Sequence, residues 1–449
     1  MKKILSVVSL AFILSSCGGG GGGQSNSVSD HSAELNYTVF QGTHITAGNE
    51  DILPIIDTLE GYDIVGLGEQ SHQGGLANRL RGRIVKGLHQ EGQLDLVAFE
   101  AGLYDGLVAW EKFLKQEQPL IEAITGPHAN YMFMQRLSLD VQEVVDYIAS
   151  QDQNTQPLIL TGFDYRINGD PSCLPNPGEE LPVMLQELKD YIDSKGMDVN
   201  EFSSIFSYAP EMACPWYYDR RFTRRAYDAL VTDLEKLLIE LEALALTESI
   251  PPYNPNQPRN FRLYASPWHQ IVKSMRSYAD KSLSDDDDHG MPLPGWNYTD
   301  EQSADNVIWL KEVWYKTQGQ TVLWAHNIHV VNCCNSVSNK LNEQSNYDIY
   351  KLGIIHGGGM LAPYEHDPTQ WEMGSFKVTT SGASINGQLL ALGLPNAFID
   401  LKTQNPDMLP FHSSSVLSYH GGPEQRGVMS DVMDGVVFIP EEEATISRF

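Results

Sequence analysis

Three short apolar runs, far apart in the chain, each end in a polar motif. The runs cover residues 63–67, 94–99 and 321–324. Apolar runs of this length, bounded by glycine and polar residues, are typical of buried strands. The polar motifs carry side chains suited to acid–base chemistry: Glu69, His72, Glu100, His326 and His329. Because ligands bind beyond the carboxyl ends of strands in open α/β sheets, we expect these side chains to share one edge of one sheet.

Helical patterns separate the predicted strands in the first part of the chain. Apolar residues recur at helical spacing in residues 78–90, and further helices are predicted near 103–115 and 139–149. A third strand follows at 157–161. Strand, helix and strand in this order imply parallel strands joined by right-handed crossovers. Further strands are predicted at the following positions: 351–355, 397–401 and 436–439.

Residues 171–318 show a different pattern, with long helices and many aromatic side chains. The clearest helix covers residues 227–246, where Leu230, Leu234 and Leu241 lie on one stripe. We interpret this stretch as a helical insertion in a single domain of residues 37–449. The predicted fold is therefore α/β, with a mainly parallel central sheet flanked by helices and a helical insertion covering the C-terminal strand ends.

The N-terminus has the layout of an exported lipoprotein. Residues 1–16 contain two lysines and an apolar stretch too short to span a bilayer, as in a signal peptide. The stretch ends in Leu-Ser-Ser-Cys, which resembles a bacterial lipobox and implies acylation of Cys17. Residues 17–36 are a Gly/Ser-rich tether. We expect a bacterial cell-envelope protein held to the membrane by lipid on Cys17, at the outer membrane because Gly18 follows the cysteine.

The formal net charge of −28 argues against binding to nucleic acid or to anionic lipid. The acidic run at residues 285–288 lacks the spaced ligands of a calcium loop and is interpreted as a solvated surface loop. Four cysteines besides Cys17 permit three disulfide pairings, and free buried thiols are equally compatible with the sequence: Cys173, Cys214, Cys333 and Cys334.

Several motifs together resemble the erythromycin esterase family. Residues 68–72 resemble its G-E-x-[ST]-H motif, and residues 324–329 resemble its W-A-H-N-x-H signature. Arg81 lies in a segment like the family's arginine-bearing helix, and Phe99-Glu100-Ala101 looks like its second acidic motif. Asp300 opens a segment like the helix before the signature. The resemblance implies a hydrolase acting on a small ester or lactone, of which macrolides are one class linked to antibiotic resistance.

Two departures from the family lie near the predicted site. Many relatives carry an acidic residue in an H-G-x-x-E stretch, where this chain has Gln73-Gly74-Gly75-Leu76. Thr299 stands where an arginine often precedes the aspartate. Hydrolysis is therefore better supported than specificity for macrolides, and the sequence does not identify the substrate.

The residue chemistry suggests water attack assisted by a histidine. His72 is suited to act as general base, and Glu69, three residues earlier, can orient its ring. Arg81 can offer donors to a developing oxyanion, while Glu100 can orient the water or pair with Arg81. His326 and His329 can supply a second acid or base, or bind the substrate oxygen. We predict these six residues as the catalytic set.

Other chemistries are less well supported. Ser71 lacks the flanking glycines of a nucleophile elbow, and nothing marks Cys333 or Cys334 as activated thiols. We expect no metal and no other cofactor, because the histidine spacing is not that of a zinc helix and Arg81 disfavours a nearby cation. Two alternatives stay open: a metal-dependent hydrolase using the same cluster, and an inactive surface-tethered binding protein. The oligomeric state is not determined by the sequence.

Overall fold

The computed structural model describes most of the chain after the predicted tether. The described residues are 35–125, 138–166, 183–212, 224–282, 293–333, 335–363, 374–405, 411–419 and 425–446. Several sequence predictions lie outside these ranges: the signal peptide, Cys17 and most of its tether, the acidic run at 285–288, and Cys173, Cys214 and Cys334.

An eight-stranded sheet forms the centre of the molecule, in the order β1-β9-β12-β6-β2-β5-β3-β4. All pairs from β12 to β4 are parallel, whereas β9 pairs antiparallel with both β1 and β12. The predicted mainly parallel sheet is confirmed. The strands have the following bounds: β1 Thr38–Val39, β2 Ile64–Glu69, β3 Leu94–Gly102, β4 Ile159–Asp164, β5 Gln320–His326, β6 Ile349–His356, β9 Ala397–Asp400 and β12 Gly435–Ile439.

The inner strands are buried along their length. Every residue of β2, β4 and β6 is buried, which explains why these strands have continuous apolar runs in the sequence. The register places Leu67 of β2 opposite Trp324 of β5 and Leu352 of β6. The polar residues that follow these three strands therefore emerge at one edge of the sheet.

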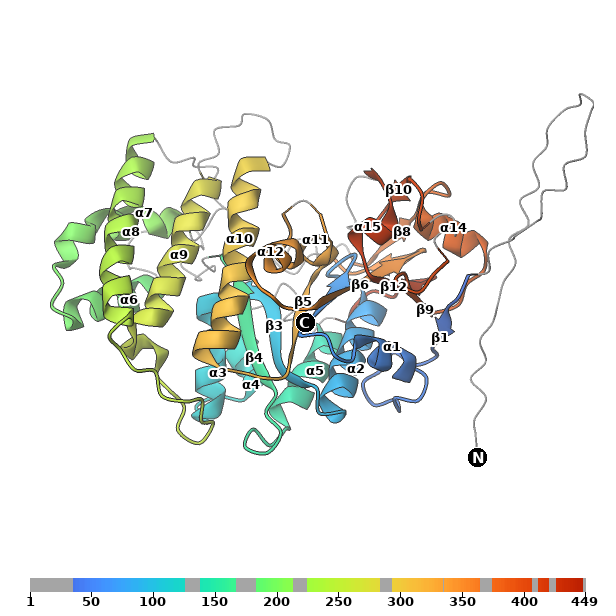
Figure 1. The fold of residues 1–449 in the computed structure, drawn as a ribbon, viewed down its shortest axis with the longest axis horizontal. Coiled ribbons are helices and arrows are strands. Elements are labelled where there is room, and N and C mark those ends of the chain that lie inside the picture. The colour runs from blue at the N-terminus through green and yellow to red at the C-terminus, as the bar shows by residue number, and fades with distance from the viewer. Residues whose placement is uncertain are drawn as a thin grey trace, which may run out of the picture.

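Helices flank the sheet (Figure 1). Helix α2 places its apolar stripe, including Leu80, Ile84 and Leu88, in the main core, and Gly82 lets it approach Val144 of α5 closely. Ser138 caps α5 by accepting a hydrogen bond from the Val141 N–H at 3.2 Å. The helices are α1 Leu53–Leu59, α2 Gly75–Gln90, α3 Leu103–Leu114, α4 Leu120–Thr125, α5 Leu139–Ala149, α11 Asn327–Val330, α12 Val337–Gln344, α14 Ile385–Ala391 and α15 Met429–Val432.

The described chain between β4 and β5 is helical. Helices α6 to α9 stand to one side of the molecule, beyond β4, whereas α10 packs on β4 and on α12 and reaches the carboxyl ends of the strands (Figure 1). The bounds are α6 Val183–Ser194, η2 Val199–Phe202, α7 Ser203–Met212, α8 Arg224–Ala245, η3 Phe261–Leu263, α9 Ala265–Ser282, α10 Leu293–Trp309 and the π-helical turn η4 Leu310–Trp314.

Two small antiparallel sheets complete the fold. They pair β7 Gly358–Leu361 with β8 Phe376–Thr379, and β10 Ser415–Leu417 with β11 Gln425–Gly427. Within the described ranges, no helix has the length and apolar character needed to cross a membrane.

Candidate active site

The six predicted site residues converge at the carboxyl ends of β2, β3 and β5. Glu69 ends β2 and lies opposite His326, which ends the neighbouring strand β5. Helix α11 begins directly after β5 and carries His329. Asn327, the first residue of α11, packs closely against Gly68 of β2. A side chain at position 68 would collide with the asparagine oxygen, so glycine permits this close contact. The edge of the sheet therefore brings together residues that are about 250 positions apart in the sequence.

A hydrogen bond joins Glu69 to His72. The distance from His72 Nδ1 to Glu69 Oε1 is 2.6 Å. The Glu69 side chain is fully buried, whereas 12% of the His72 side chain is exposed at the edge of the sheet. Since a carboxylate oxygen accepts, Nδ1–H donates, and the basic lone pair of the imidazole lies on Nε2. This is the arrangement of a histidine base that is oriented by an acid.

Arg81 lies behind Glu69 and not at the exposed edge of the site. Its guanidinium is fully buried, pairs with Glu69 Oε2, donates to Asn78 Oδ1 and stacks 4.0 Å from the Trp324 ring centre. Burial lowers the pKa of Arg81 to about 10, against the opposing effect of Glu69. We expected Arg81 to face a substrate oxygen or to pair with Glu100. Its ion-pair partner is instead Glu69, so it holds that carboxylate in place.

Glu100 is the centre of the second half of the site. Its Oε2 accepts a hydrogen bond from the His326 N–H at 2.7 Å, and its Oε1 lies 2.9 Å from Arg166 Nη2 and 3.3 Å from His329 Nε2. Burial alone raises the pKa of this carboxyl group, but His329, His72 and Arg166 hold it well below its usual value. Glu100 is therefore an anion across the neutral pH range.

His329 lies between two carboxylates. Its Nδ1 is 3.1 Å from Asp300 Oδ2 of α10, on the side opposite Glu100. Burial opposes protonation, yet Asp300 and Glu100 raise the pKa of His329 well above its usual value. The imidazole is therefore a cation at neutral pH.

His326 has the opposite electrostatic character. Its Nδ1 accepts from the Ile328 N–H at 3.3 Å, so Nε2 carries the hydrogen and donates to the Gln70 carbonyl oxygen at 2.9 Å. Burial is the main cause that lowers the pKa of His326 to about 3, and the His329 cation acts in the same direction. The neutral ring packs edge-on against His72, with 5.2 Å between the ring centroids. These contacts suit a residue that positions His72.

Sequence reasoning missed Asp164 and Arg166. Asp164 ends β4, and its Oδ2 lies 2.7 Å from Arg166 Nε, while the same guanidinium pairs with Glu100. The strand-end argument that identified Glu69 and Glu100 applies equally to Asp164. The sequence motif places Asp300 in the helix before the histidine signature, and only the tertiary structure brings it to His329.

A buried carboxylate from the C-terminal segment reaches the start of α2. Glu442 is only 2% exposed, and its Oε1 accepts a hydrogen bond from the Leu76 N–H at 2.8 Å. A side chain on Gly74 would collide with it. Burial raises the pKa of Glu442 to about 7. The start of α2 thus receives a carboxylate from a segment near the other end of the chain.

Neither a metal cluster nor a serine nucleophile is evident among the described residues. No group of three or more His, Cys, Asp or Glu side chains in these ranges is arranged to hold a metal ion. The Ser71 hydroxyl donates to Gln73 Oε1 at 2.6 Å and therefore belongs to the turn before α2. Cys333 Sγ lies 3.6 Å from the Tyr419 hydroxyl.

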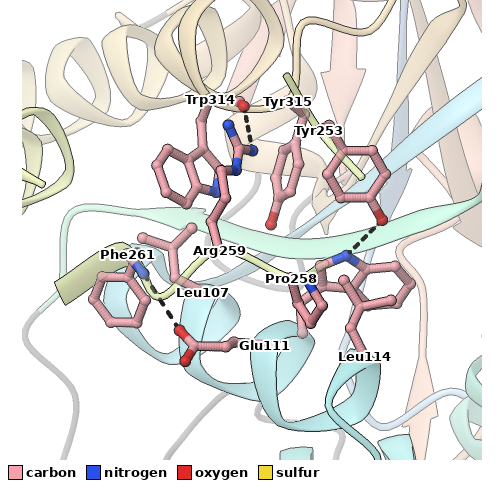
Figure 2. A pocket seen from close by; sticks show the side chains of 10 residues that line it. Leu107, Glu111, Leu114, Tyr253, Pro258, Arg259, Phe261, Trp314 and Tyr315 are labelled. Carbon is pink, nitrogen blue, oxygen red and sulfur yellow. Dashed lines mark hydrogen bonds between the residues drawn. The ribbon is translucent and has the colours of Figure 1, made fainter. Parts of the chain in front are cut away.

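An aromatic pocket lies at the opposite end of the sheet. It is lined by the second half of α3 and by residues that precede β5, including Trp110, Tyr253, Arg259, Trp314 and Tyr315 (Figure 2). Arg259 Nη2 donates to the Trp314 carbonyl oxygen, and Trp110 Nε1 donates to the Tyr253 hydroxyl at 3.1 Å. The residues that line the pocket include no histidine, and its one carboxylate, Glu111, is paired with Lys115 and Arg262. We therefore place the candidate site at the carboxyl ends of the strands.

The chain is similar to known proteins over most of its length. Residues 89–441 match the family model described as erythromycin esterase. A Bacillus subtilis (strain 168) protein named "Putative hydrolase YbfO" is 23% identical over 421 residues, which covers 88% of this chain and 86% of that protein.

Solved structures share the fold at low sequence identity. A succinoglycan biosynthesis protein superposes with a TM-score of 0.67 at 14% identity, covering 92% of this chain and 96% of that chain. A Bacillus cereus protein gives 0.66 at 16% identity, with coverage of 91% and 96%. A mutant of the erythromycin esterase EreC in its open conformation gives 0.60 at 15% identity, with coverage of 90% and 97%.

Proposed function

Because this chain belongs to the erythromycin esterase family, we propose that it is a hydrolase that cleaves a carboxylic ester or lactone by His72-assisted attack of water. The hydrolase class is supported by the family and by the name of the B. subtilis relative. The bond broken and the mechanism are our proposal. The observation that carries it is the 2.6 Å hydrogen bond from a partly exposed His72 to the buried Glu69.

In the proposed reaction, Nε2 of His72 takes a proton from water as the water oxygen attacks the carbonyl carbon. The carbonyl electron pair moves to oxygen and forms a tetrahedral oxyanion. Collapse of this intermediate restores the carbonyl and expels the alkoxide, which recovers the proton from His72. The products are a carboxylic acid and an alcohol, or a hydroxy acid from a lactone. Glu69 stabilises the transient imidazolium, and Arg81 keeps Glu69 in position.

The remaining predicted residues support this step. Neutral His326 packs against the His72 ring and limits its orientation. Glu100 holds the His326 backbone, and the cation on His329 balances the charge of Glu100 and Asp300. Together they position the attacking water and assist departure of the alkoxide.

The test is a kinetic screen of the purified protein. We expect hydrolysis of at least one member of a panel of chromogenic esters, simple lactones and a macrolide lactone. His72→Ala should lower kcat by about 10²–10⁴-fold while the protein stays folded. His89→Gln is the matched control, because His89 is buried outside the site and binds the Tyr147 hydroxyl and the Gln156 carbonyl oxygen. A folded His72→Ala enzyme with full activity would refute the assignment, and saturable binding without turnover would favour the binding-protein alternative.

The same screen separates the metal-dependent alternative. We expect turnover to persist after thorough chelation, because His326 uses both ring nitrogens and His329 is held as a cation between carboxylates. Loss of activity on chelation, restored by zinc, iron or manganese with one ion bound per chain, would establish the metal-dependent reaction.

We also propose that lipid on Cys17 anchors the protein to the cell envelope, on the basis of the lipobox-like sequence alone. Cys17→Ser should move the protein from the membrane to the soluble fraction or block its processing. Normal processing together with membrane retention of this variant would exclude a lipid anchor at Cys17.

A further inference from the structure

Arg166 lies at the edge of the site and has no role in the reaction proposed above. It lies two residues after Asp164, the last residue of β4. Like Arg81, it pairs with a glutamate of the site, but Arg81 is buried and Arg166 is partly exposed. About a quarter of its side chain is exposed, whereas that of Arg81 is not exposed at all. Of these two arginines, only Arg166 is accessible to a substrate without rearrangement of the core.

The guanidinium of Arg166 is fixed by two carboxylates. Nη2 lies 2.9 Å from Glu100 Oε1, and Nε lies 2.7 Å from Asp164 Oδ2. Two anchors of this kind orient the planar group and leave little freedom in the side chain. Among the described residues, the third nitrogen, Nη1, has no hydrogen-bond partner. Arg166 thus presents an oriented N–H donor pair at the edge of the site.

Glu100 connects this donor to the hydrolytic centre. The carboxylate that holds Arg166 also accepts from the His326 N–H at 2.7 Å, and the His326 ring packs against His72. Arg166 and the proposed base are therefore linked through Glu100 and His326.

We propose that Arg166 stabilises the oxyanion of the tetrahedral intermediate through Nη1. This inference rests on the proposed function and transfers to Arg166 the role that the sequence suggested for Arg81. Its physical basis is that a preorganised donor stabilises charge that develops in the transition state and needs little reorganisation at that moment. Because Arg166 is flanked by two carboxylates, a neutral ester is a better ground-state ligand for this position than an anionic substrate.

The decisive experiment is chemical rescue in the full-length protein. With the best ester from the screen, Arg166→Ala should lower kcat by about 10²–10³-fold with a KM change below about 3-fold. Added methylguanidinium should restore at least 10-fold of that loss, since the vacated site is open to solvent. Arg81→Ala is the matched control: it should also lose activity, but methylguanidinium should not restore it, because the cavity is closed.

Two further measurements distinguish stabilisation of the oxyanion by Arg166 from a purely structural role. Arg166→Lys, which keeps the charge and loses the planar fork, should retain more activity than Arg166→Ala. A trifluoromethyl ketone, whose hydrate mimics the oxyanion, should bind wild-type protein at least 10-fold more tightly than Arg166→Met, a variant of similar side-chain length.

Each failure has a distinct meaning. Unchanged kcat in Arg166→Ala, or equal binding of the ketone to wild type and Arg166→Met, would overturn the role of Arg166 while leaving hydrolysis by His72 intact. Loss of activity that neither methylguanidinium nor lysine restores would show that Arg166 only maintains the structure. Absence of His72-dependent hydrolysis in the wild type would instead refute the proposed function itself.

Discussion

Two arginine–tryptophan stacks can be compared: Trp324 lies in β5 near its carboxyl end, and Trp314 lies in the π-helical turn η4 that precedes the amino end of β5. Near the carboxyl end, the Arg81 guanidinium lies 4.0 Å from the Trp324 ring centre, and near the amino end, that of Arg259 lies 3.9 Å from the Trp314 ring centre. Arg81 is bound to the carboxylate of Glu69, which contacts His72. Arg259 is bound to the carbonyl oxygens of Trp314 and Pro251, and no carboxylate in the described ranges lies within ion-pair distance of it.

The difference shows that a buried cation beside a tryptophan does not by itself indicate catalysis. At the amino end, the arginine connects loops to the π-helical turn before β5, and burial lowers its pKa, opposed by neighbouring tyrosines and not by a carboxylate. At the carboxyl end, the same side-chain pair supports an anion that is coupled to a titratable histidine. The candidate site differs from the other region because Arg81 contacts Glu69, and Glu69 in turn contacts His72.

The largest effects are expected when each of the two arginines, Arg81 and Arg259, is replaced with methionine. Arg81→Met leaves Glu69 buried without its cation, so we expect a loss of about 3–5 kcal/mol in the free energy of unfolding and a large fall in kcat. Arg259→Met should cost about 1–3 kcal/mol through lost hydrogen bonds, with kcat nearly unchanged. Urea unfolding and ester kinetics on both variants provide the measurement. A similar fall in kcat for the two variants would remove the distinction between the ends.

A smaller, pH-dependent effect is expected at Glu100. Its pKa is lower in the folded state than in the unfolded chain, so its contribution to stability is present above the unfolded pKa and is lost as the pH falls through the folded pKa. Glu100→Gln should therefore lower the free energy of unfolding by about 1.5–3 kcal/mol near neutral pH, and by less in acid. Unfolding curves near pH 7 and near pH 3 measure this difference.

The control for Glu100 comes from the aromatic pocket. Glu111 is also buried and accepts from Lys115, Arg262 and the Phe261 N–H. Glu111→Gln should lower stability without lowering kcat, because its partners do not contact the histidines of the candidate site.

For Glu100→Gln, a loss of stability that is equally large in acid would contradict the coupling of Glu100 to His329 and Arg166.

The smallest effect is predicted for Ser71, which lies between Glu69 and His72 in the sequence but is assigned no chemical role. Its hydroxyl donates to Gln73 Oε1 at 2.6 Å, so Ser71→Ala should cost less than about 1.5 kcal/mol in stability and leave kcat within a few-fold of the wild type. Mass spectrometry of the protein trapped during turnover should show no acylated Ser71. An acyl-Ser71 adduct would replace water attack with covalent catalysis.

The sequence by itself predicted the main strands and the edge of the sheet where the site lies. The strands predicted at residues 63–67, 94–99, 157–161 and 321–324 agree with β2, β3, β4 and β5 to within a few residues. These strands are buried on both faces and so have apolar runs that are visible in the sequence. The contact between Glu69 and His72 is also local, because they are three positions apart at the end of one strand.

The tertiary structure decided which partners these residues have. Glu100 meets Arg166 and His329 because β3 lies between β4 and β5, an order that the apolar runs do not encode. Glu442 reaches the Leu76 N–H across 366 positions of sequence. Which carboxylate the Arg81 guanidinium contacts depends on how α2 packs over the sheet. Local patterns determine where a strand or helix forms, whereas the partners of a buried charge depend on which elements become neighbours, because only those neighbours can replace the water that the charge loses.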